Sequence, residues 1–505
     1  MSNLYELEKF FPKTGNAEAD IDFLSQAYLE TNDFKKVLNT QLRMPKIIVG
    51  KKGTGKSALV NYLEQKLKEQ NIPVLLLKPS EIEINFDDPS IGSLTRISKQ
   101  ALIKSIGMQI AKNQKKFLIE KDQAILNELA RTEGIISDDL VQDTLKILKT
   151  FGQTVAGLDF SKFAGRFYML KPEEIKRAVQ GVLSDKDKIF YLIIDDTDQI
   201  ATMSDSHHLN RIWSFLLATR DIMSELPNIK CFITLRLEIW NRLYKDDSGQ
   251  RDQRDHFRGA IYTIDSTEED IKRIIAKRMI LAAQKLNIRF DKKEYSPFFE
   301  KSFVEIPSSN HEKRYWSDYI SKRARHPRDA IQLIGQLIEN AIDQGNSKIN
   351  DTHLRNIYKQ YAKERVDDVV GEIDKECIPI SQIIDTFADC PFEKGFSINS
   401  DNLKTFIKTI PTRFNVNLFG DTLQEDERSI FKLWEYLFEI GFLGARVSDS
   451  TKPEGYNHLE KSDVKIKKEN WYFLQKILWE IHPSFRDYLI GLIEVRKKMS
   501  GFAKK

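Results

Sequence analysis

The stretch K-I-I-V-G-K-K-G-T-G-K-S-A-L-V, residues 46–60, decides the fold. Its first part, Lys46–Val49, is rich in β-branched residues, as is typical of a strand. From Ser57 onward, apolar residues recur at helical spacing. The residues between, Gly50–Ser57, match the phosphate-binding pattern G-x-x-x-x-G-K-[ST], which requires a strand before it and a helix after it. The stretch therefore predicts a P-loop at the start of a nucleotide-binding domain.

The P-loop predicts how a nucleotide is held. Its glycines let the backbone wrap around the phosphates, and the amides at the helix N-terminus point at them. We expect Lys56 to reach the β- and γ-phosphate oxygens and the Ser57 hydroxyl to bind Mg²⁺. The other residues expected to contact the nucleotide are Gly50, Lys51, Lys52, Gly53, Thr54, Gly55 and Ala58. No guanine-reading [NT]-K-x-D tetrapeptide is present, which favours ATP; the alternative is a loop that has lost nucleotide binding.

A second motif, F-Y-L-I-I-D-D-T-D, supplies acidic groups. Its apolar run, Phe190–Ile194, is typical of a buried strand, and the carboxylate on the magnesium side of a P-loop site lies at the end of such a strand. We expect Asp195 to hold Mg²⁺ through water and Asp196 to orient or deprotonate the attacking water. Asp198 is expected to cap the following helix, and it is the alternative base.

A third signal follows the next predicted strand, Ile229–Leu235. Thr234 and Arg236 end this strand, at a position that lies beside the γ-phosphate in P-loop sheets of this type. We therefore expect Arg236 to contact the nucleotide. The alternative is a surface ion pair between Arg236 and Glu238.

Further arginines are candidates for the same chemistry. Arg328 opens a predicted helix just behind Pro327, and we expect it to reach the nucleotide when the helical segment around it closes; the alternative is a salt bridge to Asp329 or Glu339. The residues that a neighbouring subunit's phosphate would meet are Arg251, Arg254 and Arg258.

Alternating strands and helices predict a doubly wound α/β domain with a parallel sheet over residues 40–266. Residues 1–39 form an N-terminal segment with a helical stretch around Asp20–Glu30, and residues 92–185 form a helical insertion. The predicted strands are Lys46–Val49, Val74–Leu77, Phe190–Ile194, Ile229–Leu235 and Ala260–Ile264. The predicted helices of the insertion are Leu94–Ala111, Gln123–Arg131, Asp138–Phe151 and Pro172–Leu183.

Two further domains are expected after the sheet. In residues 267–371, Ser266 and Glu269 have capping-box spacing and open a helix to Leu286, and the pattern stays helical throughout, with Pro327 starting a helix and Gly345 ending it. This predicts an all-helical lid. Residues 372–505 have the outline of a winged helix. Its predicted elements are the helices Ile380–Phe387, Asn402–Ile410 and Glu425–Ile440, the strands Phe442–Val447 and Trp471–Ile481, and a last helix from Pro483.

Composition excludes several classes of protein. The chain has 505 residues, enough for about three domains, and a net charge of +4, too small to indicate a nucleic-acid binder. Three cysteines without C-x-x-C spacing predict neither a disulfide framework nor a zinc site. The N-terminus has no signal-peptide pattern, and no apolar run is long enough to span a membrane. We expect a cytoplasmic protein.

Charge also bears on DNA binding by the predicted winged helix. The helix before the wing is acidic and would repel phosphate, so we favour a protein-packing or autoinhibitory role over a DNA-binding one. The acidic residues are Glu425, Asp426, Glu427, Glu435 and Glu439. The basic residues that could touch a DNA backbone are Lys461, Lys465, Lys467, Lys468 and those of the tail, Arg496–Lys505.

Taken in order, these motifs resemble the AAA+/STAND branch of P-loop ATPases, most closely bacterial ATPases of mobile-element and defence contexts. Besides the P-loop and the hhhhDD strand, the resemblance rests on E-T-N-D-F (30–34), L-R-L-E-I-W (235–240), the P-R-D helix start at Pro327 and I-H-P-S-F-R-D-Y-L (481–489), and it spans about residues 20–490. It implies the strand order 5-1-4-3-2, a helical lid that carries Arg328, and assembly into homo-oligomers. Asp196 in place of the usual Glu implies slow turnover.

The resulting hypothesis is an ATP-binding, slowly hydrolysing switch that assembles with or activates a partner effector in antiphage defence. One alternative is a DNA-loading or remodelling ATPase of the origin or transposition type. The other is a scaffold that binds nucleotide without hydrolysing it.

Overall fold

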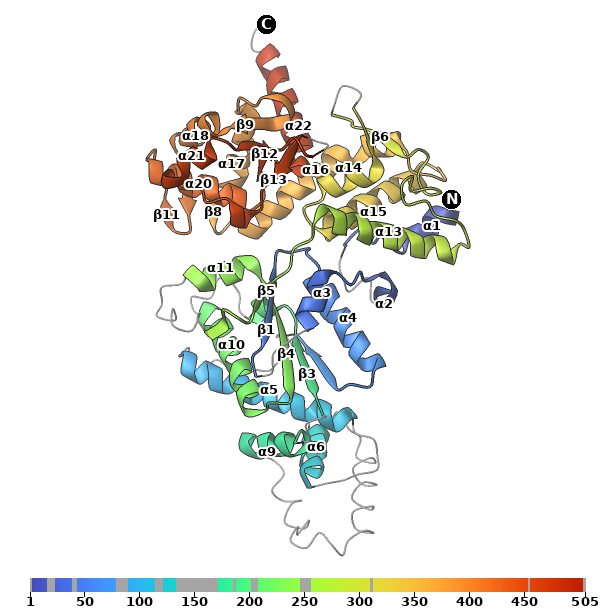
Figure 1. Cartoon of the computed structure of the whole chain (residues 1–505), viewed down its shortest axis with the longest axis vertical. Helices are drawn as coiled ribbons and strands as arrows, with labels where there is room; N and C mark the ends of the chain where they lie inside the picture. Colours follow the sequence, from blue (N-terminus) through green and yellow to red (C-terminus); the bar gives the residue numbers. More distant parts are fainter. Residues whose placement is uncertain are drawn as a thin grey trace, which may run out of the picture. The chain divides into compact units, whose positions relative to one another are not determined.

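The structure of the protein is a computed structural model (Figure 1). The chain forms two compact units. The first is Asn16–Ser266, and the second consists of Met1–Gly15 together with Thr267–Lys505. The residues that the structure describes are 2–15, 23–38, 43–78, 90–113, 121–132, 171–184, 188–200, 208–245, 256–308, 312–452 and 455–502.

A five-stranded parallel sheet forms the centre of the first unit. Its strands are β1 (Lys46–Gly50), β2 (Val74–Leu77), β3 (Phe190–Ile194), β4 (Ile229–Arg236) and β5 (Ile261–Thr263). They lie in the order β2-β3-β4-β1-β5, which is the predicted order 5-1-4-3-2 named from the other edge. The fold class predicted from the sequence is thus confirmed. In this order β4 separates the P-loop strand β1 from the acidic strand β3.

Helices cover both faces of this sheet because side chains alternate along each strand. Ile47 and Val49 of β1 face one core, whereas Ile48 faces the other. The first core is closed by α5 (Ile91–Asn113) and α10 (His208–Glu225). The second is closed by α2 (Leu24–Ala27), α3 (Asn32–Leu38) and α4 (Lys56–Glu69).

The segment predicted as a helical insertion contributes directly to this core. Its described helices are α5, α6 (Lys121–Thr132) and α9 (Pro172–Val182), close to three of the predicted ones. Leu102 and Ile106 of α5 are fully buried in the same cluster as the strand residues. Helix α5 therefore covers the sheet, and α6 and α9 pack on α5. The fourth predicted helix, Asp138–Phe151, lies outside the described residues.

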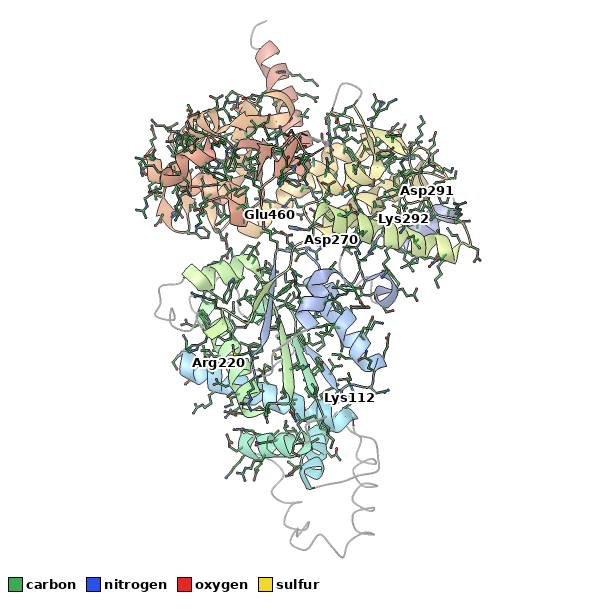
Figure 2. All side chains as sticks on the ribbon, in the orientation of Figure 1. Lys112, Arg220, Asp270, Asp291, Lys292 and Glu460 are labelled. Atoms are coloured by element: carbon green, nitrogen blue, oxygen red, sulfur yellow. The ribbon has the colours of Figure 1, made fainter. Side chains whose placement is uncertain are left out.

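Four helices dominate residues 267–371 in the second unit: α13 (Glu268–Lys285), α14 (Trp316–Arg323), α15 (Pro327–Asp343) and α16 (Asp351–Ile373). The prediction that Ser266 and Glu269 cap the first of them was wrong by one residue. Thr267 is the N-cap, accepting from the Asp270 amide at 3.1 Å and donating its own amide to the Asp270 carboxylate at 3.2 Å. Figure 2 labels Asp270 at this end of α13. The pairs Ser266–Glu269 and Thr267–Asp270 have the same spacing in the sequence. The Ser266 amide donates to the Asp265 carboxylate and takes no part in capping α13.

The prediction of a helical pattern throughout residues 267–371 was also wrong. Strands β6 (Phe303–Glu305) and β7 (Lys313–Tyr315) form an antiparallel hairpin before α14. The rings of Phe303 and Tyr315 meet across it with centroids 4.1 Å apart. Each strand has three residues, too short a run for alternation to be recognised in the sequence.

The first residues of the chain belong to the helical unit, which was not predicted. Helix α1 (Ser2–Glu8) packs on α13 and α15, and Leu7 and Phe11 are fully buried there. The Arg278 side chain donates to the Phe10 carbonyl at 2.7 Å. A Cβ atom at Gly335 would lie 2.7 Å from the Phe11 carbonyl oxygen, so only glycine allows this approach. Of the predicted stretch Asp20–Glu30, the structure describes only α2 as helix.

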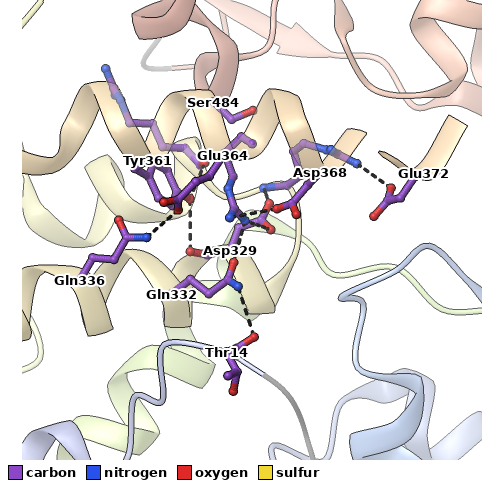
Figure 3. A network of polar contacts seen from close by, with 12 residues as sticks. Thr14, Asp329, Gln332, Gln336, Tyr361, Glu364, Asp368, Glu372 and Ser484 are labelled. Carbon is purple, nitrogen blue, oxygen red and sulfur yellow. Dashed lines mark hydrogen bonds and ion pairs between the residues drawn. The ribbon is translucent and has the colours of Figure 1, made fainter. Parts of the chain in front are cut away.

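A polar network, buried at its centre, ties α15 to α16 and to the N-terminal residues (Figure 3). Asp329 of α15 accepts from Arg365 of α16 at 2.7 Å, and their side chains are only 11% and 3% exposed. Gln332, one turn later, donates to the Thr14 carbonyl at 3.2 Å. These bonds join three separate segments of the chain through α15.

The last part of the chain combines helices with a small antiparallel sheet of order β13-β12-β14-β9. In chain order the elements are α17 (Ile380–Thr386), β9 (Ser397–Asn399), α18 (Ser400–Lys408), α20 (Glu427–Glu439), β12 (Leu443–Ser448), β13 (Tyr456–His458), α21 (Trp471–Leu474), β14 (Leu478–Ile481) and α22 (Pro483–Phe502). The other elements of this part are α19 (Ile410–Arg413), β8 (Cys377–Ile378), β10 (Asn417–Leu418) and β11 (Asp421–Thr422), and in the first unit α11 (Leu237–Lys245) follows β4.

One predicted strand in this part needs correction. Of Trp471–Ile481, only Leu478–Ile481 is strand, and the first residues form the helical turn α21. Trp471 and Leu474 pack toward the core at helical spacing, whereas the side chain of Tyr472 is 76% exposed. Strand β9, which pairs with β14, was not predicted, because it has only three residues.

The motif I-H-P-S-F-R-D, residues 481–487, links α22 to α14. The Asp487 carboxylate accepts from Arg323 of α14 at 3.2 Å, and the two side chains are 4% and 9% exposed. Ser308 donates to the other oxygen of Asp487. No helix within the described ranges is long and apolar enough to cross a membrane.

His482 of this motif makes the stability of the unit sensitive to pH. Desolvation, reinforced by nearby cations such as Arg325 and Arg486, holds the pKa of His482 well below its usual range. Its Nδ1 accepts from the Ser484 amide at 3.3 Å. In the unfolded chain the ring takes up a proton below about pH 6.5, whereas the folded protein resists it. Stability is therefore full above this pH and falls as the pH drops further.

We expect His482→Asn, which keeps a hydrogen-bond acceptor near the position of Nδ1, to reduce the loss of stability at low pH. The free energy of unfolding measured by urea titration between pH 7.5 and 5 checks it. His256→Asn, at an exposed histidine of the other unit, is the control. An unchanged pH slope in His482→Asn would contradict the prediction.

Candidate nucleotide-binding site

The P-loop adopts the backbone that phosphate binding requires. Gly53 and Gly55 have φ values of 84° and 95°, in the left-handed region that favours glycine. A Cβ at Gly50 would lie 2.7 Å from the Thr54 hydroxyl oxygen. Helix α4 begins at Lys56, so the free amides of its first turn open toward the loop. The loop is thus a concave set of donors at a positive helix end, which suits an anion.

Lys56 is held inside this loop. Its ammonium donates to the carbonyls of Gly50 at 2.7 Å and Lys51 at 3.0 Å, and the residue is 8% exposed. Burial lowers the pKa of Lys56, while the carboxylates of Asp198 and Glu238 act in the opposite direction. The other residues predicted to contact the nucleotide lie around it: Lys51, Lys52, Gly53 and Thr54 in the loop, and Ser57 and Ala58 in the first turn of α4.

Thr234 of β4 organises the two acidic residues that follow β3. Its hydroxyl donates to the Asp195 carboxylate at 2.6 Å and accepts from the Asp196 amide at 2.9 Å. Thr234 is fully buried, and Asp195 is 1% exposed. Asp196 has a φ of 52°, a left-handed conformation that costs free energy in a residue other than glycine. The sequence placed Thr234 near the γ-phosphate but did not reveal this double contact, which depends on β3 and β4 being neighbours.

Arg236 ends β4 opposite Gly50 of β1, at the start of the P-loop. The sequence left Glu238 as its alternative partner, but its Nε donates to the Asp198 carboxylate at 2.8 Å. Asp198 lies in a short 3₁₀ turn, η3 (Thr197–Ile200), and its side chain is 7% exposed. Burial raises the pKa of Asp198, and the Arg236 guanidinium opposes that effect.

Neither Arg258 nor Arg328, the remaining candidate arginines that the structure describes, is brought to this site by the first unit. Arg328 belongs to the second unit, at the start of α15, and neither predicted partner binds it: Asp329 pairs with Arg365, and Glu339 pairs with Lys13. Arg258 is exposed just before β5. Arg251 and Arg254 lie outside the described residues.

The donor set near β3 fits Mg²⁺. In nucleotide sites this ion takes one or two protein oxygens and completes its shell with phosphates and water. Ser57, in the first turn of α4, and Asp195, directly after β3, supply a hydroxyl and a carboxylate at the same edge of the sheet. The described residues contain no group of three or more His, Cys, Asp or Glu side chains that would hold a metal without a nucleotide.

The acidic helix α20 neutralises some of the lysines considered for DNA contact. Glu427 pairs with Lys404 at 2.7 Å and with Lys468 at 2.6 Å. Asp426 is the N-cap of α20 and accepts from the Ser429 amide at 2.9 Å. In the same region Lys461 donates to the Glu439 carbonyl at 2.6 Å.

A P-loop after β1, a buried strand β3 followed by Asp195 and an additional strand β4 between them define the fold of P-loop nucleoside triphosphatases of the additional-strand class. Comparisons place the chain near particular proteins. Residues 269–370 match the FunZ-associated C-terminal helical domain. The chain is 24% identical over 498 residues to the "putative transposon gamma-delta 80.3 kDa protein" of Escherichia coli K12, with 94% of this chain and 66% of that protein aligned. It thus spans just under two thirds of this relative's length.

Solved structures show a more distant likeness. The ORC2 protein of Aeropyrum pernix, in ADPNP-ADP complexes, is 10% identical at a TM-score of 0.40, covering 92% of this chain and 93% of that one. Cdc6p of Pyrobaculum aerophilum is 12% identical at a TM-score of 0.35, covering 93% of each chain.

Proposed function

We propose that this chain is an ATP-binding, slowly hydrolysing ATPase of the AAA+/STAND kind that acts as a nucleotide-dependent switch. The observation that carries the proposal is the cluster at one edge of the sheet: Lys56 in the P-loop, Asp195 bound to Thr234, and Arg236 beside Gly50. These are a cation for the phosphates, a carboxylate for the metal side and a second cation at the strand end. Mg²⁺, when bound, neutralises phosphate charge.

Each residue has a distinct task in this proposal. Lys56 exchanges its two carbonyl contacts for phosphate oxygens, and the P-loop amides hold the phosphate chain. Asp196 orients or deprotonates the attacking water. Its short side chain, on a left-handed backbone, reaches less far than the Glu of fast hydrolysing relatives, which supports slow turnover.

The second unit supports the switch. We propose that residues 267–371 form a lid that contributes Arg328, and that residues 372–505 form a winged helix used for contacts between proteins. The ion pair of Arg323 with Asp487 joins these two parts, so they would move together. The output of the switch is assembly into homo-oligomers and activation of a partner effector in antiphage defence, and the protein works in the cytoplasm.

A second candidate function is a DNA-loading or remodelling ATPase. The name of the E. coli relative, a transposon protein, favours it. Against it stand the internal ion pairs of α20, which bind Lys468 to Glu427. ATP turnover with and without duplex DNA separates the two functions: stimulation by DNA supports the loader, and indifference to DNA supports the switch. A chain that binds ATP but never hydrolyses it would instead be a scaffold.

Asp196→Asn tests the assigned base. Asparagine tolerates the left-handed backbone and keeps the shape of the side chain, but it cannot accept a proton. We expect ATP binding to stay within about threefold and turnover to fall by about 100-fold, the usual contribution of a general base. Steady-state phosphate release and ATP titration measure the two effects. Asp221→Asn, in a surface ion pair with Arg220 of the same unit, is the control; wild-type turnover in Asp196→Asn would assign the base elsewhere.

A further inference from the structure

Asp198 is the acidic residue of the β3 motif that the proposed chemistry leaves without a task. Its side chain is 7% exposed, and its Oδ2 accepts from Nε of Arg236 at 2.8 Å. A buried carboxylate is costly unless it is paired, so Arg236 accounts for the burial of Asp198. The converse does not hold, because Arg236 is 37% exposed and could stay solvated without a partner.

The sequence favoured a helix cap for Asp198, and the structure argues against that role. Element η3 is a single 3₁₀ turn, Thr197–Ile200, and Asp198 lies inside it. The second carboxylate oxygen, Oδ1, is buried and has no hydrogen-bond partner in the described part of the chain. A purely structural ion pair is strongest when both oxygens are satisfied, which is not the arrangement here.

The contact uses one particular edge of the arginine. A guanidinium is a planar fork whose Nε and two Nη groups all donate. Binding through Nε fixes the plane and direction of the group. Among the described residues, Arg236 contacts Asp198 through Nε and not through its Nη groups, which leaves both Nη groups to contact an anion.

The proposed phosphate site, the P-loop, follows β1, the strand that pairs with β4. Arg236 is the register partner of Gly50, whose carbonyl accepts from Lys56 at 2.7 Å. The charges of both Arg236 and Asp198 act on the Lys56 ammonium, so the three groups share one electrostatic site. An arginine free to rotate would still neutralise charge there. It would lose rotational freedom when the anion binds, however, and this entropy cost would weaken binding.

We propose that Asp198 is a positioning residue, which holds Arg236 by Nε so that its Nη groups face the γ-phosphate of bound ATP. This rests on the proposed nucleotide site. It assigns to the Asp198–Arg236 pair the discrimination between ATP and ADP, because ADP has no γ-phosphate for Arg236 to contact.

Nucleotide titrations of the full chain test the proposal without requiring turnover. Calorimetry with Mg²⁺ and either ADP or β,γ-imido-ATP is carried out on the wild type, Asp198→Asn, Arg236→Ala and the double variant. We expect ADP affinity to stay within about twofold in all four. Affinity for the ATP analogue should fall about tenfold in each single variant, the loss expected for one charge-assisted hydrogen bond. The double variant should be no weaker than Arg236→Ala, because the two residues act as a unit.

Each outcome decides the matter. If Asp198→Asn binds the analogue like the wild type, or adds its loss to that of Arg236→Ala, Asp198 does not act through Arg236. An equal loss for ADP and the analogue would make its role structural. Equal affinity of the wild type for ADP and the analogue would also overturn the proposal, whereas a wild type that binds neither nucleotide would overturn the proposed function itself. Asp221→Asn is the matched control and should bind both nucleotides like the wild type.

Discussion

Replacing Lys56 by alanine should abolish measurable ATP binding. The ammonium is the only side-chain cation of the P-loop that lies buried in it, donating to the carbonyls of Gly50 and Lys51. On nucleotide binding it would exchange these for phosphate oxygens. Two charge-assisted hydrogen bonds of about 1.5 to 3 kcal/mol each correspond to a loss of roughly 100-fold to 10,000-fold in affinity. Titration with a fluorescent ATP analogue measures it.

A matched control separates this effect from damage to α4. Lys68→Ala removes an exposed lysine of the same helix, which pairs with Glu64 at 2.8 Å. It should bind ATP like the wild type. Retained tight binding by Lys56→Ala would refute the assignment of Gly50–Ser57 as the nucleotide site, and with it the proposed function.

Replacing Asp487 by alanine should cause the largest loss of stability in the second unit. The carboxylate is 4% exposed and pairs with Arg323, which is 9% exposed, so alanine would leave a buried guanidinium without its counter-charge. Removing one partner of a buried ion pair costs about 3 to 5 kcal/mol. The unit contains Trp316, Trp434, Trp471 and Trp479, so urea unfolding followed by tryptophan fluorescence reports on it.

Two further variants make the result specific. Glu494→Ala removes an exposed pair with Lys359 in the same unit and should cost no more than about 1 kcal/mol. Replacing both partners by apolar residues, Arg323→Met with Asp487→Leu, should recover most of the loss, because no buried charge then remains unpaired. If Asp487→Ala unfolds at the same urea concentration as the wild type, the pair does not hold α22 to α14.

The strands of the parallel sheet could be predicted because their signals are local and strong, whereas their order was implied only by the family resemblance. The runs before Gly50 and Asp195 are β-branched and apolar, and glycines and acidic residues mark where each strand ends. Short elements were lost or misplaced for the opposite reason. The three-residue strands of the β6–β7 hairpin show no recognisable period, and Ser266 and Thr267 offer equivalent capping boxes whose choice depends on where α13 packs.

By itself, the sequence determined the P-loop, the acidic strand end, the five strands of a parallel sheet and the residue types of the site. These follow from patterns within a few residues of one another, where local backbone preference and the side-chain period leave few choices. Only the tertiary structure decided which of these residues touch. Thr234 joins Asp195 and Asp196, and Asp198 holds Arg236, because β4 lies beside both β3 and β1. Such pairings depend on neighbours about 40 residues apart in the chain, a distance at which no local pattern carries information.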